Sequence, residues 1–311
     1  MNPNDPPVLP DPTPEPADML RAPPLLPPAP TPAGLGHEQL ALQLARDYLD
    51  EKRRERRWRM GLRLGWLLLF ALLVGHFWSQ QSPVLSAGVV HTALVEVRGE
   101  IAAGSEASAE VLVSALKNAF ADKGARAVVL RINSPGGSPV QAGIVYDEIR
   151  RLKAQYNKPV YAVVEDVCAS GAYYIAAATD QIFVDKASMV GSIGVLIDDF
   201  GFSGLLSKLG IERRLITAGE HKGLLDPFSP LPAKERELAQ AMIDEVHEQF
   251  IAVVREGRGQ RLKADEKTFS GLVWNGSRAV EMGLADGFGN LDQVARDVVG
   301  VEEVIDYTPH D

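Results

Sequence analysis

The fold is decided by two consecutive stretches, ARAVVLRINSPGGSPVQAGIVYDEIRRLKAQ at residues 125–155 and KPVYAVVEDVCASGAYYIAAATD at residues 158–180. Each opens with a short run rich in β-branched residues, passes through a turn of small residues and continues as a helical pattern. Apolar strands that alternate with helices are typical of sheets whose faces are covered by helices. The two stretches therefore predict an α/β domain.

The same alternation continues on both sides of these stretches. Further strand candidates are ALVEVRGEI (93–101), DQIFVD (180–185) and IERRLIT (211–217), and EVLVSALKNAF (110–120) has apolar residues at helical spacing. A long amphipathic helix is marked by Leu238, Met242, Val246, Phe250 and Val253. One globular domain is expected over residues 92–307.

Four segments of different character precede this domain. Residues 1–36 are dense in proline, which fixes φ and removes backbone donors, so a disordered, partly polyproline II arm is expected. Residues 37–59 predict a basic amphipathic helix, residues 60–79 a transmembrane anchor and residues 80–91 a linker. The chain thus predicts an anchored α/β domain behind a proline-rich arm.

The anchor prediction rests on an apolar run that follows six cations between Lys52 and Arg59. From Met60 to Trp78 a helix spans roughly 28 Å, close to the hydrocarbon thickness of a bilayer. A buried core helix would rarely follow such a cationic cluster, and a cleaved signal sequence would lie at the N-terminus. The cations favour a cytoplasmic N-terminus in the bacterial inner membrane, with the globular domain on the periplasmic side.

Composition excludes several classes of function. The 311 residues carry a net charge of −9, which argues against nucleic acid as a partner because phosphate binding needs a basic field. Cys168 is the one cysteine, so no intramolecular disulfide forms. The six histidines are scattered and no Cys/His cluster has metal-binding spacing, so neither a metal nor a cofactor is expected.

Three short segments carry residue types that point to chemistry. In the first, SPGGS at 134–138, adjacent glycines allow close approach to the backbone, and their N–H groups suit a developing oxyanion. An ordinary strand-to-helix turn explains the segment equally well.

In the second segment, VCASGAYYIAAATD at 167–180, Ser170 lies at a strand-to-helix junction, where a helix N-terminus stabilises negative charge. A helix-capping serine is the competing interpretation, and the adjacent Cys168 is expected to be an inert packed residue.

The third segment, AGEHKGLLDPFSP at 218–230, places Lys222 in a loop punctuated by glycine and proline. A lysine accepts a proton only as a neutral amine, a form that burial among apolar groups favours. Nearby leucines and Phe228 would help to supply such surroundings, whereas a solvated loop lysine is the competing interpretation. Ser192, in MVGSIGV at 189–195, has a hydroxyl suited to orienting a neutral amine.

Taken in order, the motifs SPGGS, ASGAYYIA (169–176), GSIGV (191–195) and HKGLLDPF (221–228) resemble the signal peptide peptidase A family. These are membrane-anchored serine proteases of the Ser/Lys dyad class with a crotonase-like, Clp protease-like fold. The resemblance covers roughly residues 92–306, including the C-terminal stretch at 268–291. The proline-rich arm does not belong to this pattern.

The resemblance implies a role for each matching residue. Ser170 matches the nucleophile, Lys222 the general base and Ser192 the residue that orients the lysine amine. Gly137 matches an oxyanion-hole donor, with the amide of Ser170 or Gly171 as its companion. The single-unit length implies a ring-shaped homo-oligomer, an octamer being one form, in which Lys222 reaches the Ser170 of a neighbour. Signal-peptide remnants or other short apolar peptides are the implied substrates.

Three other functions compete with this interpretation. A Ser-His-Asp hydrolase would use His221, and an acyl-CoA-binding enzyme of the crotonase type would use the glycine amides to hold a thioester oxyanion. The third is a non-catalytic membrane scaffold on the same fold. The first alternative requires His221, whereas the other two do not require Ser170.

Overall fold

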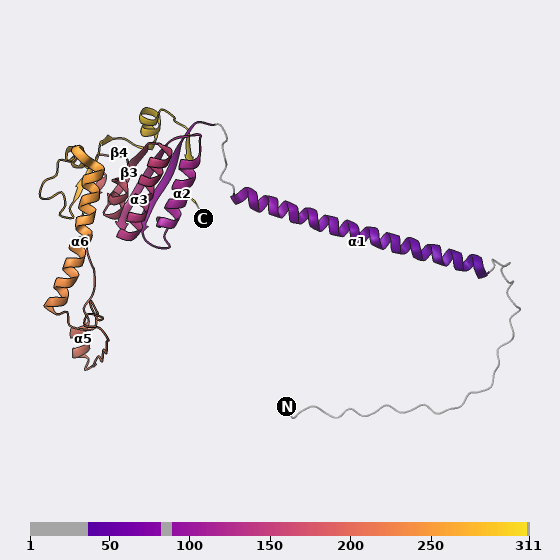
Figure 1. Cartoon of the computed structure of the whole chain (residues 1–311), viewed down its shortest axis with the longest axis horizontal. Helices are drawn as coiled ribbons and strands as arrows, with labels where there is room; N and C mark the ends of the chain where they lie inside the picture. The colour runs from indigo at the N-terminus through magenta and orange to yellow at the C-terminus, as the bar shows by residue number, and fades with distance from the viewer. Residues whose placement is uncertain (1–36, 82–88, 310–311) are drawn as a thin grey trace, which may run out of the picture. The chain divides into compact units, whose positions relative to one another are not determined.

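The computed structural model of the chain describes residues 37–81 and 89–309 (Figure 1). It divides into two compact units between Phe77 and Trp78, and each unit is described by itself. The expected proline-rich arm at residues 1–36 and most of the expected linker at 80–91 lie outside the described residues.

The described residues of the first unit belong to helix α1 (His37–Gln81), which continues past Phe77 and runs without a break through the expected basic segment and the expected anchor. Between Tyr48 and Gly75 this helix is long and apolar enough to cross a membrane, with a mean hydropathy of 1.4, and this part is not buried within the structure. By length and composition alone, α1 is therefore compatible with a protein that associates with a membrane.

The second unit is built on one eight-stranded sheet with the order β6-β5-β3-β2-β1-β8, while β4 pairs with β3 and β7. All pairs are parallel except β5 with β6. The strands are β1 (His91–Ile101), β2 (Ala125–Gly137), β3 (Val160–Ala169), β4 (Gln181–Val184), β5 (Met189–Gly191), β6 (Val273–Asn275), β7 (Gly287–Phe288) and β8 (Val304–Asp306). The expected α/β fold class is confirmed as a mixed α/β sheet.

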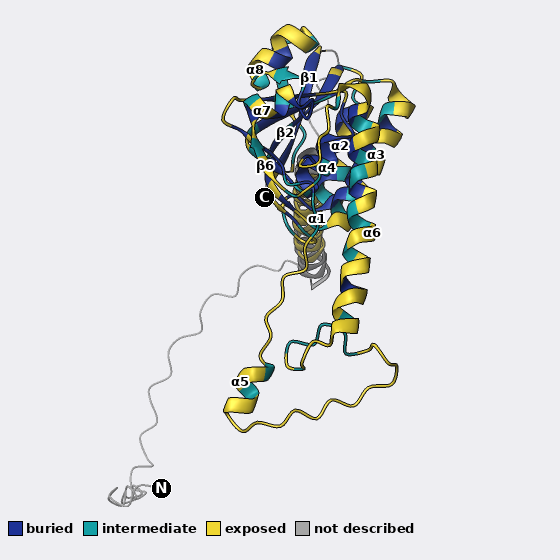
Figure 2. Ribbon diagram, turned by 90° about the vertical axis from the view of Figure 1, so that its left-hand side faces the viewer, coloured by how far each residue is buried: buried dark blue, intermediate teal, exposed yellow. Residues whose placement is uncertain are grey.

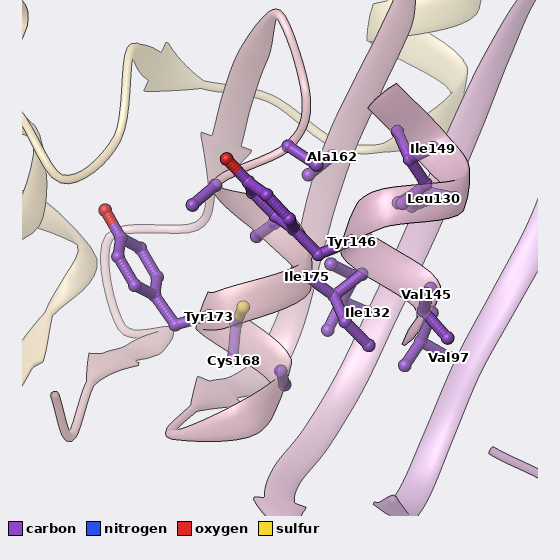
Figure 3. Packing of buried hydrophobic residues seen from close by; sticks show 14 of the residues in the cluster. Val97, Leu130, Ile132, Val145, Tyr146, Ile149, Ala162, Cys168, Tyr173 and Ile175 are labelled. Carbon is purple, nitrogen blue, oxygen red and sulfur yellow. The ribbon is translucent and has the colours of Figure 1, made fainter. Parts of the chain in front are cut away.

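Helices connect the parallel strands, as parallel pairing requires. The helices are α2 (Ala109–Ala121), α3 (Pro139–Tyr156), α4 (Gly171–Ala176), α5 (Ser203–Lys208), α6 (Ala233–Arg258), α7 (Gly276–Glu281) and α8 (Leu291–Gln293), with a 3₁₀ turn at Gly259–Arg261 and a π-helical turn at Val294–Val299. Successive side chains of a strand point to opposite faces of the sheet. In β2, Leu130 and Ile132 therefore pack in the main core, while Val129 packs in a smaller cluster on the other face. Figure 3 shows the main core between the sheet and its helices.

Between β5 and α6 the chain forms a long extension, residues 195–232, whose one helix is α5. The strand expected at 211–217 is wrong: the structure has no strand there, and Ile216 is 94% exposed. A β-branched run becomes a strand only when another strand accepts its backbone hydrogen bonds. Figures 1 and 2 show the extension at the outer end of α6, away from the sheet.

The expected long amphipathic helix is confirmed as α6, but the two halves of this helix differ. Phe250, Val254 and Arg258 in its C-terminal half are buried, whereas Leu238 and Met242 in its N-terminal half are exposed (Figure 2). Ala239 on the N-terminal half lines a cavity of about 330 Å³ together with residues of the extension. The inner half of α6 therefore belongs to the domain core, and the outer half carries the extension.

The inner end of α6 is held by a buried ion pair. Arg258, whose side chain is fully buried, donates to the Gly283 carbonyl and to the Asp286 carboxylate, each at 2.8 Å. Burial alone would raise the pKa of Asp286, but the hydrogen bond and charge of Arg258 outweigh it and hold that pKa below its usual value. This contribution to stability is present above about pH 4 and is lost as the pH falls through the lowered pKa.

Replacing Asp286 by asparagine should lower the free energy of unfolding by about 3–5 kcal/mol, because it leaves the buried Arg258 charge without its counter-ion. Urea unfolding followed by tryptophan fluorescence measures this change. Asp297→Asn is the matched control: Asp297 pairs with Arg296 while 62% exposed, so it should change stability by less than about 0.5 kcal/mol. Equal effects of the two substitutions would contradict the prediction.

Candidate active site

Ser170 occupies a strained turn at the end of β3 and the start of α4. Its φ is +54°, which a residue with a side chain adopts only when its surroundings over-determine the backbone. Its N–H donates to the Gly191 carbonyl at 2.8 Å. Within the described residues its hydroxyl makes no capping hydrogen bond to α4, so Ser170 is not a simple capping serine. The half-buried hydroxyl is left available for chemistry.

The glycine turn at the end of β2 lies directly against Ser170. A Cβ added to Gly136 would lie 2.7 Å from both the Gly171 nitrogen and the Ser170 Cβ, and φ at Gly136 is +96°. A Cβ added to Gly171 would lie 3.3 Å from the Gly137 nitrogen. Gly171 is the first residue of α4, so its N–H has no acceptor within that helix. The turn thus brings the backbone nitrogens of Gly137 and Gly171 together beside the nucleophile candidate.

Ser192 reaches the same place from the neighbouring strand. Ala169 at the end of β3 pairs with Gly191 at the end of β5, so Ser170 and Ser192 each follow directly on paired residues. Ser192 has a φ of +51°, and its N–H donates to the Leu272 carbonyl at 2.8 Å. Two left-handed serines therefore lie on adjacent parallel strands, where the strand ends meet.

Within a single copy of the chain, Lys222 lies on the extension and not beside Ser170. It is exposed in a turn of the extension, where its N–H donates to the Gly219 carbonyl at 3.2 Å. Within residues 89–309, no hydrogen bond or ion pair joins the Lys222 amine to Ser170 or Ser192. His221 lies in the same turn and is 40% exposed. One copy of the chain therefore brings Ser170, Gly171, Gly137 and Ser192 together and leaves Lys222 on the extension.

Cys168 is not a rival nucleophile. Its side chain is fully buried in the main core, where Figure 3 shows it among the packed side chains. Burial raises the pKa of the Cys168 thiol well above its usual value. Because the thiolate is the reactive form, this cysteine stays inert.

Sequence reasoning missed one residue of the site, Ser134. Its buried hydroxyl accepts a hydrogen bond from the Gly136 N–H at 3.1 Å, which holds the glycine turn in place. A serine two residues before a glycine turn is the pattern of a local side-chain-to-backbone hydrogen bond, and that pattern could have identified it.

On the peptidase function that the resemblance implies, replacing Gly136 by alanine should reduce kcat/KM by about 10²–10³-fold, the scale of the loss when an oxyanion donor such as the neighbouring Gly137 N–H is displaced. The added Cβ would lie 2.6 Å from the Ala169 carbonyl oxygen, so the turn must move away from Ser170. Kinetics on a short fluorogenic apolar peptide measure the loss. Gly143→Ala, on α3 with open space around its Cβ position, is the matched control and should keep the wild-type rate. Retained activity in Gly136→Ala would contradict this account of the turn.

Comparison with known proteins matches residues 152–303 to the model of peptidase family S49. A putative protease of Synechocystis is 32% identical over 63% of this chain and 69% of its own length. A putative signal peptide peptidase SppA of Enterococcus faecium is 33% identical over 56% of this chain and 50% of its own length. A Brucella melitensis protein named as a Na⁺/H⁺ antiporter is 49% identical over 60% of this chain.

These likenesses define the family to which the chain belongs. The chain belongs to peptidase family S49, the family of signal peptide peptidase A. It spans a quarter of the length of the antiporter-named protein and half that of the Enterococcus protein.

Proposed function

We propose that this protein is a membrane-anchored serine endopeptidase with a Clp protease-like, crotonase-type domain, which cleaves short apolar peptides such as signal-peptide remnants. Ser170 is the nucleophile and Lys222 the general base. The observation that carries the proposal is the left-handed Ser170, held against the glycine turn with its hydroxyl uncapped. A strained serine beside backbone N–H groups suits attack on a carbonyl.

The proposed reaction has two halves. The neutral Lys222 amine takes the Ser170 proton, and the serine oxygen attacks the peptide carbonyl to form a tetrahedral intermediate. The N–H groups of Gly137 and Gly171 stabilise its oxyanion, and the protonated lysine then gives its proton to the leaving amine. Water, deprotonated by the same lysine, attacks the acyl-enzyme and releases the second product. Ser192 orients the lysine amine by a hydrogen bond.

The lysine is proposed to come from a neighbouring copy in a ring-shaped homo-oligomer. The extension that carries it exposes apolar side chains that a second copy would bury: Leu196, Phe200, Leu205, Leu209, Ile211, Leu215 and Ile216. Burial against that copy would desolvate Lys222 and favour its neutral amine.

The proposed location is the inner membrane, with α1 as the single span. The cations before the span favour a cytoplasmic N-terminus and a periplasmic peptidase domain. Peptides released from or left in the membrane would then reach the site.

A fluorophosphonate probe tests the nucleophile directly on the full chain in detergent micelles. It phosphonylates activated serines, so mass spectrometry should find the adduct on Ser170 and on no other serine. Lys222→Met should abolish labelling, while His221→Gln, the adjacent matched control, should label at the wild-type rate. Labelling that depends on His221 and tolerates Lys222→Met would favour a Ser-His-Asp triad. If no adduct formed on Ser170, the proposal that Ser170 is the nucleophile would be wrong.

A further inference from the structure

Helix α6 connects the extension to the candidate active site. The extension leads directly into the outer end of α6, and the inner half of α6 packs on α4, the helix that follows Ser170. The contact is aromatic: the ring centroids of Phe250 and Tyr174 are 5.2 Å apart. One turn further out, the half-buried His247 is the next α6 side chain to contact the site.

His247 contacts the backbone that follows Ser192. Its Nε2 lies 3.1 Å from the carbonyl oxygen of Ile193, and because a carbonyl only accepts, Nε2 carries the proton and donates it. The Gly271 N–H donates to the same carbonyl, also at 3.1 Å. Ile193 itself is fully buried, so its carbonyl depends on protein donors.

This contact completes the support of a strained residue. On its N-terminal side Ser192 is held by the donation of its N–H to the Leu272 carbonyl. On its C-terminal side the carbonyl of the following residue, Ile193, accepts hydrogen bonds from Gly271 and His247. A φ of +51° at a serine persists only where neighbours fix both sides of it. The His247 donor comes from α6, whereas the other two partners come from the segment that leads into β6.

We propose that His247 is a positioning residue: its Nε2–H fixes the Ile193 carbonyl, keeps Ser192 in its left-handed conformation, and so ties the helix that bears the extension to the active site. The catalytic part of this inference rests on the proposed function, in which Ser192 orients the lysine amine. The structural part, the tie between α6 and the Ser192 loop, does not depend on it.

Two amide substitutions separate this role from simple packing. Glutamine places its amide nitrogen near the position of histidine Nε2, whereas asparagine places it near Nδ1 and does not reach the Ile193 carbonyl. In the full chain in detergent micelles, His247→Asn should lower the peptidase kcat about 10- to 100-fold with KM little changed, since small misplacements of catalytic groups cost this much. His247→Gln should restore most of the wild-type kcat. Equal kcat values for the two variants would overturn the catalytic part.

Amide hydrogen exchange tests the tie itself, independently of activity. Peptides covering residues 189–196 and 268–275 should exchange faster in His247→Asn than in wild type and in His247→Gln, while the peptide covering β1 stays unchanged. Unchanged exchange in 189–196 would overturn the tie. If Ser170→Ala retained activity while exchange responded as expected, the proposed function would fail and the tie between α6 and the Ser192 loop would stand.

Discussion

Ser170→Ala should reduce peptide cleavage by about 10⁴-fold or more, the scale on which hydrolases lose activity when the nucleophile is removed. In the proposed mechanism the hydroxyl oxygen of Ser170 forms the acyl-enzyme, so without it the remaining backbone donors can only bind and polarise the substrate. Cleavage of a short apolar peptide by the full chain in detergent measures the loss. Cys168 offers no substitute, because its buried thiol is held in the protonated form.

A folding control makes this result specific to the nucleophile. Alanine keeps the Cβ of Ser170 and removes an oxygen that makes no cap to α4, so the melting temperature should stay within a few degrees of wild type. Cleavage by Ser170→Ala at the wild-type rate would be incompatible with the proposed mechanism. It would mean that a group other than the Ser170 hydroxyl attacks the peptide.

Mixing two inactive variants should restore activity. When Ser170→Ala and Lys222→Met chains are co-expressed in equal amounts, about a quarter of the sites in a mixed ring combine an intact serine with an intact lysine from the neighbour. Peptidase activity should therefore recover to about a quarter of wild type, although each variant alone is inactive. Methionine keeps the length of the lysine side chain while removing the amine.

The same experiment distinguishes the two arrangements of the dyad. If Lys222 acted on Ser170 of its own chain, every mixed ring would contain only broken pairs and no activity would return. Native mass spectrometry of the co-expressed sample confirms that the two chains have assembled together. Mixed assemblies without activity would rule out a dyad shared between subunits. A fully active Lys222→Met ring would instead exclude this lysine as the base.

Much of the fold could be predicted because its determinants are local. The strand-turn-helix order of residues 125–180 follows from β-branched runs, glycines and helical periodicity, and the structure confirms the resulting α/β sheet. The place of Ser170 at the junction of β3 and α4 was also predictable, because the change from strand to helix pattern marks it.

The strand predicted at 211–217 failed for a non-local reason. Its β-branched residues favour extended structure, but the extension carries them away from every strand of the described sheet. Backbone groups that find no neighbouring strand are solvated instead, and no regular strand forms. Strand propensity describes which backbone conformation a residue favours locally, and it carries no information about whether a partner strand lies close enough to pair.

Most helices and strands of this protein, its glycine turn and the serine at a strand end follow from the sequence alone, since each depends on neighbours a few residues away. Tertiary contacts place β5 beside the end of β3, which brings Ser192 next to Ser170, whereas Lys222 lies on the extension. They also bring His247, from a helix far along the chain, to the Ile193 carbonyl. The physical reason is that strand order and helix docking depend on which apolar faces are buried together across long sequence separations, and no local pattern encodes that choice.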